Sequence, residues 1–116
     1  MAISEAFAGT QSITNDEWDL PTDSTTITEN AADGVYQVLL DLSLLVDGDV
    51  FRFKAYESVQ AGDTKSVFYS QDFANAQGTE DIWISPSFIL MHKWTFSLEK
   101  ITGTDHVITW SIRKVA

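Results

Sequence analysis

The chain has 116 residues, 44% of them hydrophobic, a formal net charge of −10 and no cysteine. This length suits a single domain that buries a core without covalent staples, and the lack of cysteine excludes disulfides, thiolate metal sites and a cysteine nucleophile. Residues 1–51 hold ten acids and no Lys or Arg, whereas residues 52–116 hold seven of each sign. Nucleic-acid phosphates and anionic membranes repel such a chain, so we expect neither as a partner.

Residues 1–33 are polar, acidic and rich in Thr and Ser. They predict short exposed strands at 8–14 and 25–28, separated by a turn around Pro21. The first five residues contain no base and no long apolar core, so we do not expect a signal peptide. Because residues 1–33 bury few apolar groups, they are either edge strands of the domain or an acidic arm that orders on a partner.

The middle of the chain predicts three strands. Alternation at Tyr36, Val38 and Leu40 indicates the first, which follows the Asp33-Gly34 turn signal. The segment 41–49 allows at most one helical turn, with Ser43 as its cap and Gly48 at its end. Strands are then expected at 50–59 and 65–73, joined by a hairpin turn at 61–64.

The last third of the chain predicts one interrupted strand and one hairpin. Residues 82–84 and 88–91 form a strand that Pro86 breaks or confines to a sheet edge. Alternation is cleanest in the segments around Phe96 and Trp110, which predict a terminal hairpin across the turn 102–105. No helical period persists, so we predict an all-β, single-domain antiparallel β-sandwich or small barrel over 1–116, with about eight short strands.

Catalytic and metal-binding patterns are weak in this sequence. His92 and His106 are expected at opposite ends of the terminal hairpin, too far apart to act as a pair. Asp47-Gly48-Asp49 lacks the ligand spacing of a calcium loop and is interpreted as an acidic turn. Carboxylate pairs such as Glu17 with Asp19, or Glu80 with Asp81, lack the cleft that acid–base catalysis needs. We therefore predict no catalytic residue, no metal, no cofactor and no enzymatic activity.

Several aromatic residues are not all explained by the core alternation. Such side chains on a β surface either bind sugars and proteins or stabilise the sheet through cross-strand packing, and both interpretations stay open. They are Trp18, Tyr36, Tyr56, Tyr69 and Trp83.

Over residues 33–115 the pattern resembles small structural proteins of tailed bacteriophages. The segments that carry this resemblance are DGVYQV (33–38), DL (41–42), GDVFRF (48–53), YE (56–57), PSFIL (86–90), GTD (103–105) and WSIRK (110–114). The resemblance implies a virion component and carries over no catalytic residues. Capsid decoration proteins of such phages are often small, cysteine-free, all-β and trimeric.

The resemblance leads to a prediction of a capsid decoration, or cement, protein that binds the outside of the assembled head. It implies a homotrimer that is assembled in the host cytoplasm, localises to the virion and has the major capsid protein as its partner. The alternative is a tail-associated or host-binding module for a glycan or receptor. In the arm interpretation, Phe7 or Trp18 fills a pocket on the partner while Asp16, Glu17 and Asp19 face basic residues.

Overall fold

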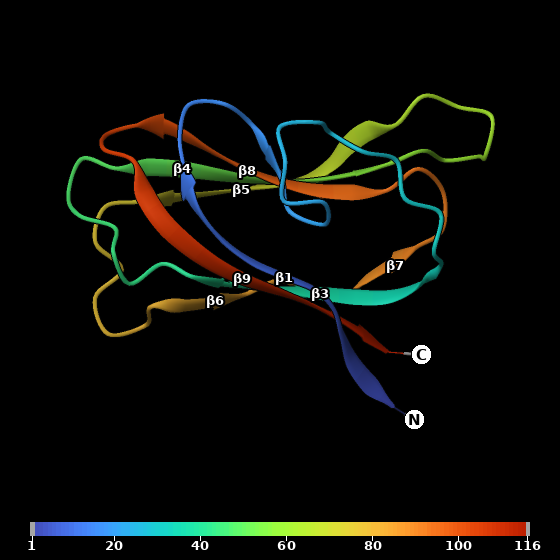
Figure 1. The fold of residues 1–116 in the computed structure, drawn as a ribbon, viewed down its shortest axis with the longest axis horizontal. Helices are drawn as coiled ribbons and strands as arrows, with labels where there is room; N and C mark the ends of the chain where they lie inside the picture. Colours follow the sequence, from blue (N-terminus) through green and yellow to red (C-terminus); the bar gives the residue numbers. More distant parts are fainter. Residues whose placement is uncertain (1, 116) are drawn as a thin grey trace.

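The computed structural model describes residues 2–115 as two antiparallel sheets packed face to face (Figure 1). In sheet A, β9 lies between β1 and β3, and β3 pairs on its other side with both β6 and β7. In sheet B the order is β2, β8, β4 and β5. The strands are β1 (Ile3–Ile13), β2 (Trp18–Asp19), β3 (Gly34–Asp41), β4 (Val50–Glu57), β5 (Ser66–Ala74), β6 (Ile82–Ile84), β7 (Phe88–Leu90), β8 (Thr95–Thr102) and β9 (His106–Val115). The prediction of an all-β antiparallel sandwich is confirmed.

The strand order is that of a jelly roll. β6 and β7 can be counted as one strand broken at Pro86, which makes β8 the seventh strand and β9 the eighth. The two sheets then have the strand orders 1-8-3-6 and 2-7-4-5, which is the double Greek key of that fold. Only β4 and β5 are both consecutive in the chain and paired with each other. Almost every connection therefore crosses from one sheet to the other.

The predicted terminal hairpin is wrong in one respect. β8 and β9 follow each other in the chain, but β8 pairs with β2 and β4 while β9 pairs with β1 and β3. Their alternating patterns are real because each strand turns one face toward the shared core. Alternation identifies the buried face of a strand and not its hydrogen-bonded neighbour, so two strands that face each other across the core have the pattern of a hairpin.

An aromatic cluster fills the space between the sheets. The ring of Trp94 lies 4.4 Å from that of Tyr36 and 5.5 Å from that of Phe96, measured between centroids. The ring of Trp83 is likewise tilted against that of Phe53, with 5.1 Å between their centroids. Trp94, Phe96 and Phe53 are fully buried, so these tilted contacts add to the stabilisation that burial of the rings provides.

The connection between β2 and β3 is anchored on this cluster by polar groups of aromatic residues. The indole Nε1 of Trp94 donates to the carbonyl of Ala32 at 2.9 Å, and the hydroxyl of Tyr36 donates to the same oxygen at 2.7 Å. The indole Nε1 of Trp110 donates to the carbonyl of Leu20 at 3.1 Å. Each buried indole thus has its hydrogen-bond partner, and both ends of the connection are held on the core.

Two strands within residues 2–33 are paired into the sheets. β1 pairs with β9 along its whole length, apart from a bulge between Glu5 and Phe7, and β2 pairs with β8. Both are edge strands of the sandwich. The segment 42–49 makes tight turns, and within the described residues no helix is long and apolar enough to cross a membrane.

Candidate binding surface

The two histidines lie at opposite ends of β4. His106 Nε2 lies 2.6 Å from Oδ2 of Asp49, which precedes β4, and the carbonyl of His92 accepts a hydrogen bond from the amide of Ser58, which follows β4. They form no pair. Within residues 2–115 no group of three or more His, Cys, Asp or Glu side chains is placed to hold a metal ion.

Asp49 holds two loops together through hydrogen bonds. Its buried carboxylate accepts hydrogen bonds from the amide of Val46 at 2.9 Å and the amide of Thr104 at 3.0 Å, besides its contact with His106. The hydrogen bond from Val46 is the largest influence on this group, and together with Thr104 and His106 it lowers the pKa of Asp49 against the opposing effect of burial. The Asp47-Gly48-Asp49 segment is therefore an internal loop clamp.

Asp19 has a similar internal role on sheet B. Its fully buried carboxylate accepts hydrogen bonds from the amide of Thr22 at 3.1 Å, the amide of Thr28 at 3.1 Å and the hydroxyl of Thr95. The hydroxyls of both Thr22 and Thr28 bind it as well. These donors satisfy the buried charge and fold the loop 20–28 over sheet B.

The other predicted partner-binding residues are also accounted for within the fold, with one exception. Glu17 accepts a hydrogen bond from the hydroxyl of Tyr56 at 2.5 Å. Phe7 is half-buried with its ring 6.3 Å from that of Trp94, and Trp18 is half-buried with its Nε1 donating to Asp23 at 2.8 Å. The exception is Asp16, whose side chain is exposed. Contact of these residues with a partner stays a prediction.

The aromatic residues singled out in the sequence do not form an exposed platform. Tyr36 is buried, and Trp18, Tyr56, Tyr69 and Trp83 are half-buried. The rings of Tyr69 and Trp83 pack against aromatic rings of the core. Burial and the hydrogen bond to Glu17 raise the pKa of Tyr56 well above its ordinary range, so this residue keeps its proton at neutral pH.

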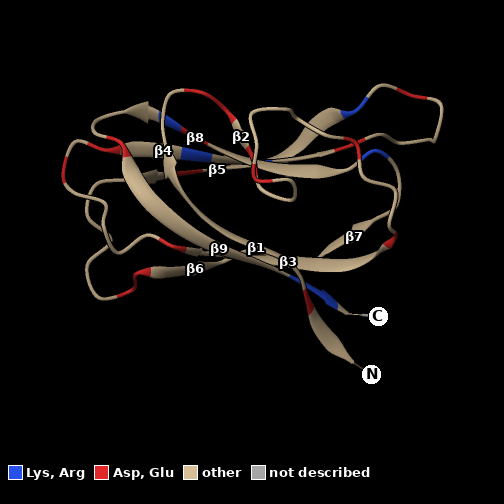
Figure 2. Ribbon diagram, in the orientation of Figure 1, with Lys and Arg blue, Asp and Glu red and all other residues tan. Residues whose placement is uncertain are grey.

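The outer face of sheet B is closed by its own polar groups. Arg52 on β4 forms a two-pronged ion pair with Asp72 on β5, at 2.8 and 3.1 Å. Lys54 on β4 pairs with Glu99 on β8 at 2.8 Å and approaches Glu17 at 3.9 Å. Figure 2 shows the basic segments of β4 and β8 among the acidic residues of this layer. Its charges are therefore matched within the protein.

The outer face of sheet A is different, because apolar rows lie on either side of a polar row formed by Glu5, Arg113 and Gln37. One row crosses four strands as Ala8, Ser111, Leu39 and Ile84, in the register of the strand pairs. Ile84 is 55% exposed, and its neighbour Ile82, one row along, is 54% exposed. Outward positions of an antiparallel sheet are usually polar, so these two exposed isoleucines make the face a candidate interaction surface.

A groove of about 680 Å³ runs over this face. Its floor is formed by small or hydroxyl-bearing residues on β1 and β9, including Gly9, and its wall by Leu39 and Ile82. Beyond the polar row, Ile3 and Ile89 stand at the two ends of another cross-strand row and are 71% and 83% exposed. We call the whole surface the sheet A face.

One end of the groove is acidic. A second hollow, of about 620 Å³, shares Asp41 and Ile82 with the groove and is also lined by Glu80 and Asp81. Hydrogen bonds from Ser43 lower the pKa of Asp41, so this carboxylate is ionised at neutral pH. The acidic segment at the start of β6 is visible in Figure 2. Asp41, Glu80 and Asp81 thus gather at one end of the groove, whose own lining also includes Glu5 and Arg113.

Sequence reasoning missed these residues, although a signal was present. The sequence is Val-Leu-Leu at 38–40 in β3 and Ile-Trp-Ile at 82–84 in β6. Apolar residues therefore lie on both faces of these two paired strands. Such a pattern indicates a strand that is covered on both faces. In the sequence it was interpreted only as a core signal.

Comparisons with protein-family models and with curated proteins found no match. A comparison with solved structures found a similar fold in the crystal structure of the Yersinia pseudotuberculosis-derived mitogen. The TM-score is 0.56 at 12% sequence identity, and the match covers 99% of this chain and 86% of the mitogen chain. At this identity the likeness shows a shared fold.

The predicted function as a capsid decoration protein, with its tail-associated alternative, is corrected by this comparison. The similar structure is a bacterial mitogen and not a structural protein of a phage particle. The segments that carried the resemblance contain residues with plain structural roles: Tyr36, Phe53 and Trp110 are core residues, and Asp49 is the loop clamp. The pattern therefore describes how the sandwich packs, and a packing pattern does not specify a function.

Proposed function

We propose that this chain is a non-catalytic binding protein that holds a protein partner against the sheet A face. The observation that carries the proposal is the contrast between the two outer faces. The outer face of sheet B consists of matched ion pairs, whereas the sheet A face exposes Ile82 in an open groove, Ile84 in the neighbouring row and Ile89 farther along the sheet. Contiguous exposed apolar surface beside polar groups is the usual mark of an interaction site.

Charge indicates the chemistry of the partner. The chain carries a net charge of −10, and Asp41, Glu80 and Asp81 gather at one end of the groove. A partner surface with apolar side chains and one or two Lys or Arg residues at the matching end would be steered to this face and oriented on it. Apolar contacts would supply most of the affinity, because exposed ion pairs contribute only about 0–1 kcal/mol each.

The proposal does not depend on the mitogen. The name of that protein describes an effect of its own chain. At 12% sequence identity, a partner of the mitogen cannot be assigned to the present chain. What the two proteins share is the sandwich, and support for a binding role comes from the surface of the present chain.

The test uses a yeast-displayed library of random short peptides as the probe. Peptides selected on the wild-type chain should be rich in apolar residues with Lys or Arg. They should bind the double variant Ile82→Ser, Ile84→Ser at least about tenfold more weakly, since about 1.4 kcal/mol of lost apolar contact corresponds to that factor. Both side chains are more than half exposed, so the variant should fold like the wild type.

A matched control is Val59→Ser, which removes an exposed apolar side chain after β4, far from the groove lining. It should bind the selected peptides with unchanged affinity. The double variant Glu80→Gln, Asp81→Asn should weaken the binding of the basic peptides, more so at low salt. Selected peptides that bind the Ile82/Ile84 variant as tightly as the wild type would refute the proposal, as would a selection that yields no binders.

A further inference from the structure

The four edges of the two sheets are protected to very different degrees. β2 has only two residues, and β6 and β7 have three each and are separated by Pro86. β1 is long but has a bulge at Glu5, where a charge and a break in register meet. Short strands, proline, charges and bulges are the devices by which natural sheets prevent pairing with other chains. β5 has nine residues, no proline and no lysine.

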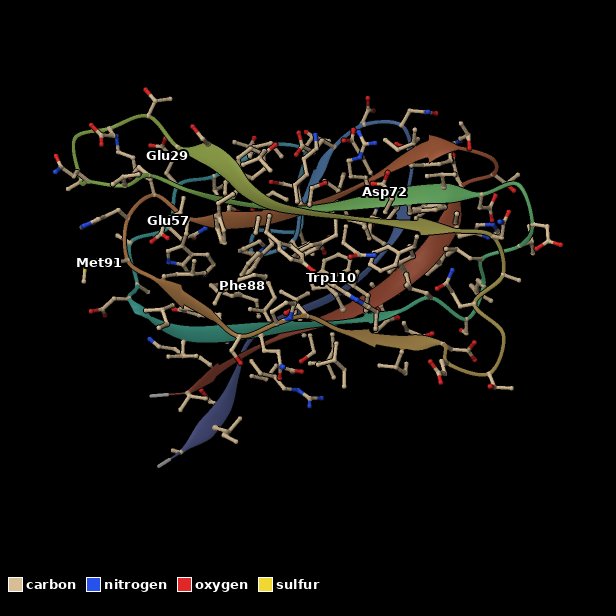
Figure 3. All side chains as sticks on the ribbon, turned by 180° about the vertical axis from the view of Figure 1, so that it is seen from behind. Glu29, Glu57, Asp72, Phe88, Met91 and Trp110 are labelled. Carbon is tan, nitrogen blue, oxygen red and sulfur yellow. The ribbon has the colours of Figure 1, made fainter. Side chains whose placement is uncertain are left out.

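The outer side of β5 is free of strand partners within the described residues. β5 is the last strand of sheet B, and its only pairing is with β4. A bulge opposite Ala55 and Tyr56 leaves Phe68 without a Cα partner, and from Tyr69 to Ala74 the register is regular. Figure 3 shows this strand crossing the front of the molecule, with Asp72 labelled beside it. The regular segment is therefore a template for one more strand.

This edge is electrically neutral in spite of the charge of the whole chain. Asp72 is the one charged residue of β5, and Arg52 binds both of its carboxylate oxygens. The pKa of Asp72 is lowered chiefly by that hydrogen-bonded pair, so the pair stays intact at neutral pH. A second acidic copy can approach this edge without placing two unmatched carboxylates against each other.

Apolar side chains mark one end of the same edge. Val67 and Phe68 are 45% and 48% exposed, and the ring of Phe68 meets that of Phe88 edge-on at 5.5 Å. In an antiparallel pair of identical strands, each copy would bring Phe68 toward the C-terminal half of the other β5. Such a pair would bury both apolar ends and hydrogen-bond both free edges.

We propose that β5 pairs antiparallel with β5 of a second copy, which joins two B sheets into one continuous sheet of eight strands. Pairing of a strand with itself is isologous and closes at two copies, so the product is a two-fold dimer and not the trimer expected from the sequence. The contact is a single strand pair, which lies at the small end of the range for protein interfaces, and we expect a dissociation constant in the micromolar range. The sheet A face stays free in this dimer.

Sedimentation velocity over a wide range of protein concentration tests the proposal. The wild-type chain should convert from monomer to dimer, and Ser70→Glu should stay monomeric at all concentrations. Ser70 is exposed on the regular segment of β5, so the new carboxylate would face either its own copy or Asp72 across the two-fold axis. The matched control is Ser12→Glu on β1, also exposed, which should dimerise like the wild type.

Hydrogen exchange gives an independent readout that does not depend on a variant. Amides of residues 69–74 that point away from β4 should exchange more slowly at high concentration than at low concentration, while those of β1 should not change. A wild-type chain that is monomeric at every concentration would overturn the proposal. Loss of the dimer in Ser12→Glu but not in Ser70→Glu would overturn it in favour of the β1 edge.

Discussion

Gly9 on β1 faces the ring of Trp110 on β9, and its replacement by alanine tests how tightly the core is packed. A Cβ atom at Gly9 would lie 2.3 Å from Cζ2 of Trp110 and within 3 Å of two further ring atoms. The ring cannot easily move away, because it is 2% exposed and its Nε1 is bound to the carbonyl of Leu20.

The expected effect combines two opposing contributions. Replacing glycine by alanine where the backbone allows it stabilises a protein by about 0.4–1 kcal/mol through the unfolded chain. Overpacking of a filled core destabilises it by about 1–3 kcal/mol. For Gly9→Ala we expect a net loss of about 1–2 kcal/mol in the free energy of unfolding, because the contact involves three atoms of a ring that is held in place.

A double-mutant cycle isolates the clash. Trp110→Leu removes the ring and is itself destabilising by about 3 kcal/mol. In that background Gly9→Ala should become neutral or stabilising by up to about 1 kcal/mol, which corresponds to a coupling energy of about 1–3 kcal/mol between the two sites. Urea unfolding followed by far-UV circular dichroism measures all four proteins. Gly62→Ala is the control, since a Cβ there meets nothing within 4 Å.

Two results would refute this reasoning. The first is a Gly9→Ala protein as stable as the wild type, which would mean that the Trp110 ring has room to shift. The second is a loss of equal size with and without the Trp110 ring, which would place the effect in the strand backbone.

Two further predictions concern the Asp49 clamp and the first strand. Because the pKa of Asp49 is lowered in the folded protein, its contribution to stability is present above the ordinary carboxyl pKa and is lost as pH falls through the folded value. Asp49→Asn should therefore destabilise the protein by about 1–3 kcal/mol at neutral pH and progressively less below about pH 4, as measured by urea unfolding at each pH; a pH-independent difference would contradict the role of its charge. Deletion of residues 1–14 removes β1, with Phe7 and Ile13, and leaves β9 without one neighbour, so we expect loss of cooperative thermal unfolding in calorimetry; a truncated chain that unfolds cooperatively near the wild-type temperature would show that β1 is an accessory strand.

Local sequence patterns predicted most of the strands. Pairing and contacts between residues far apart in the chain could not be predicted. The hairpin of β4 and β5 was predictable because a short turn joins strands that pair with each other. The partners of β8 and β9 were not, because each pairs with strands from far earlier in the chain. Asp19 could not be predicted as buried, since its donors Thr22, Thr28 and Thr95 meet only after two sheets and a loop have assembled.

The candidate surface escaped prediction for a related reason. Ile82 and Ile84 form a row with β3 only when β6 pairs with it, and the groove needs β1 and β9 beside them. The acids of 1–33 were more conspicuous in the sequence because that segment contains no Lys or Arg. In the fold Asp19 and Glu17 are taken up by internal hydrogen bonds, whereas Asp41, which lies outside that segment, borders the groove.

The position of β9 has a consequence for how this protein folds during its synthesis on the ribosome. β9 is synthesised after the other eight strands of the described residues, yet it lies between β1 and β3 in sheet A. Until it emerges, β1 and β3 have no common neighbour, so sheet B can pack only against separate parts of sheet A. The core therefore stays incomplete until β9 has been synthesised, and folding then depends on contacts between distant parts of the chain, which are slow to form.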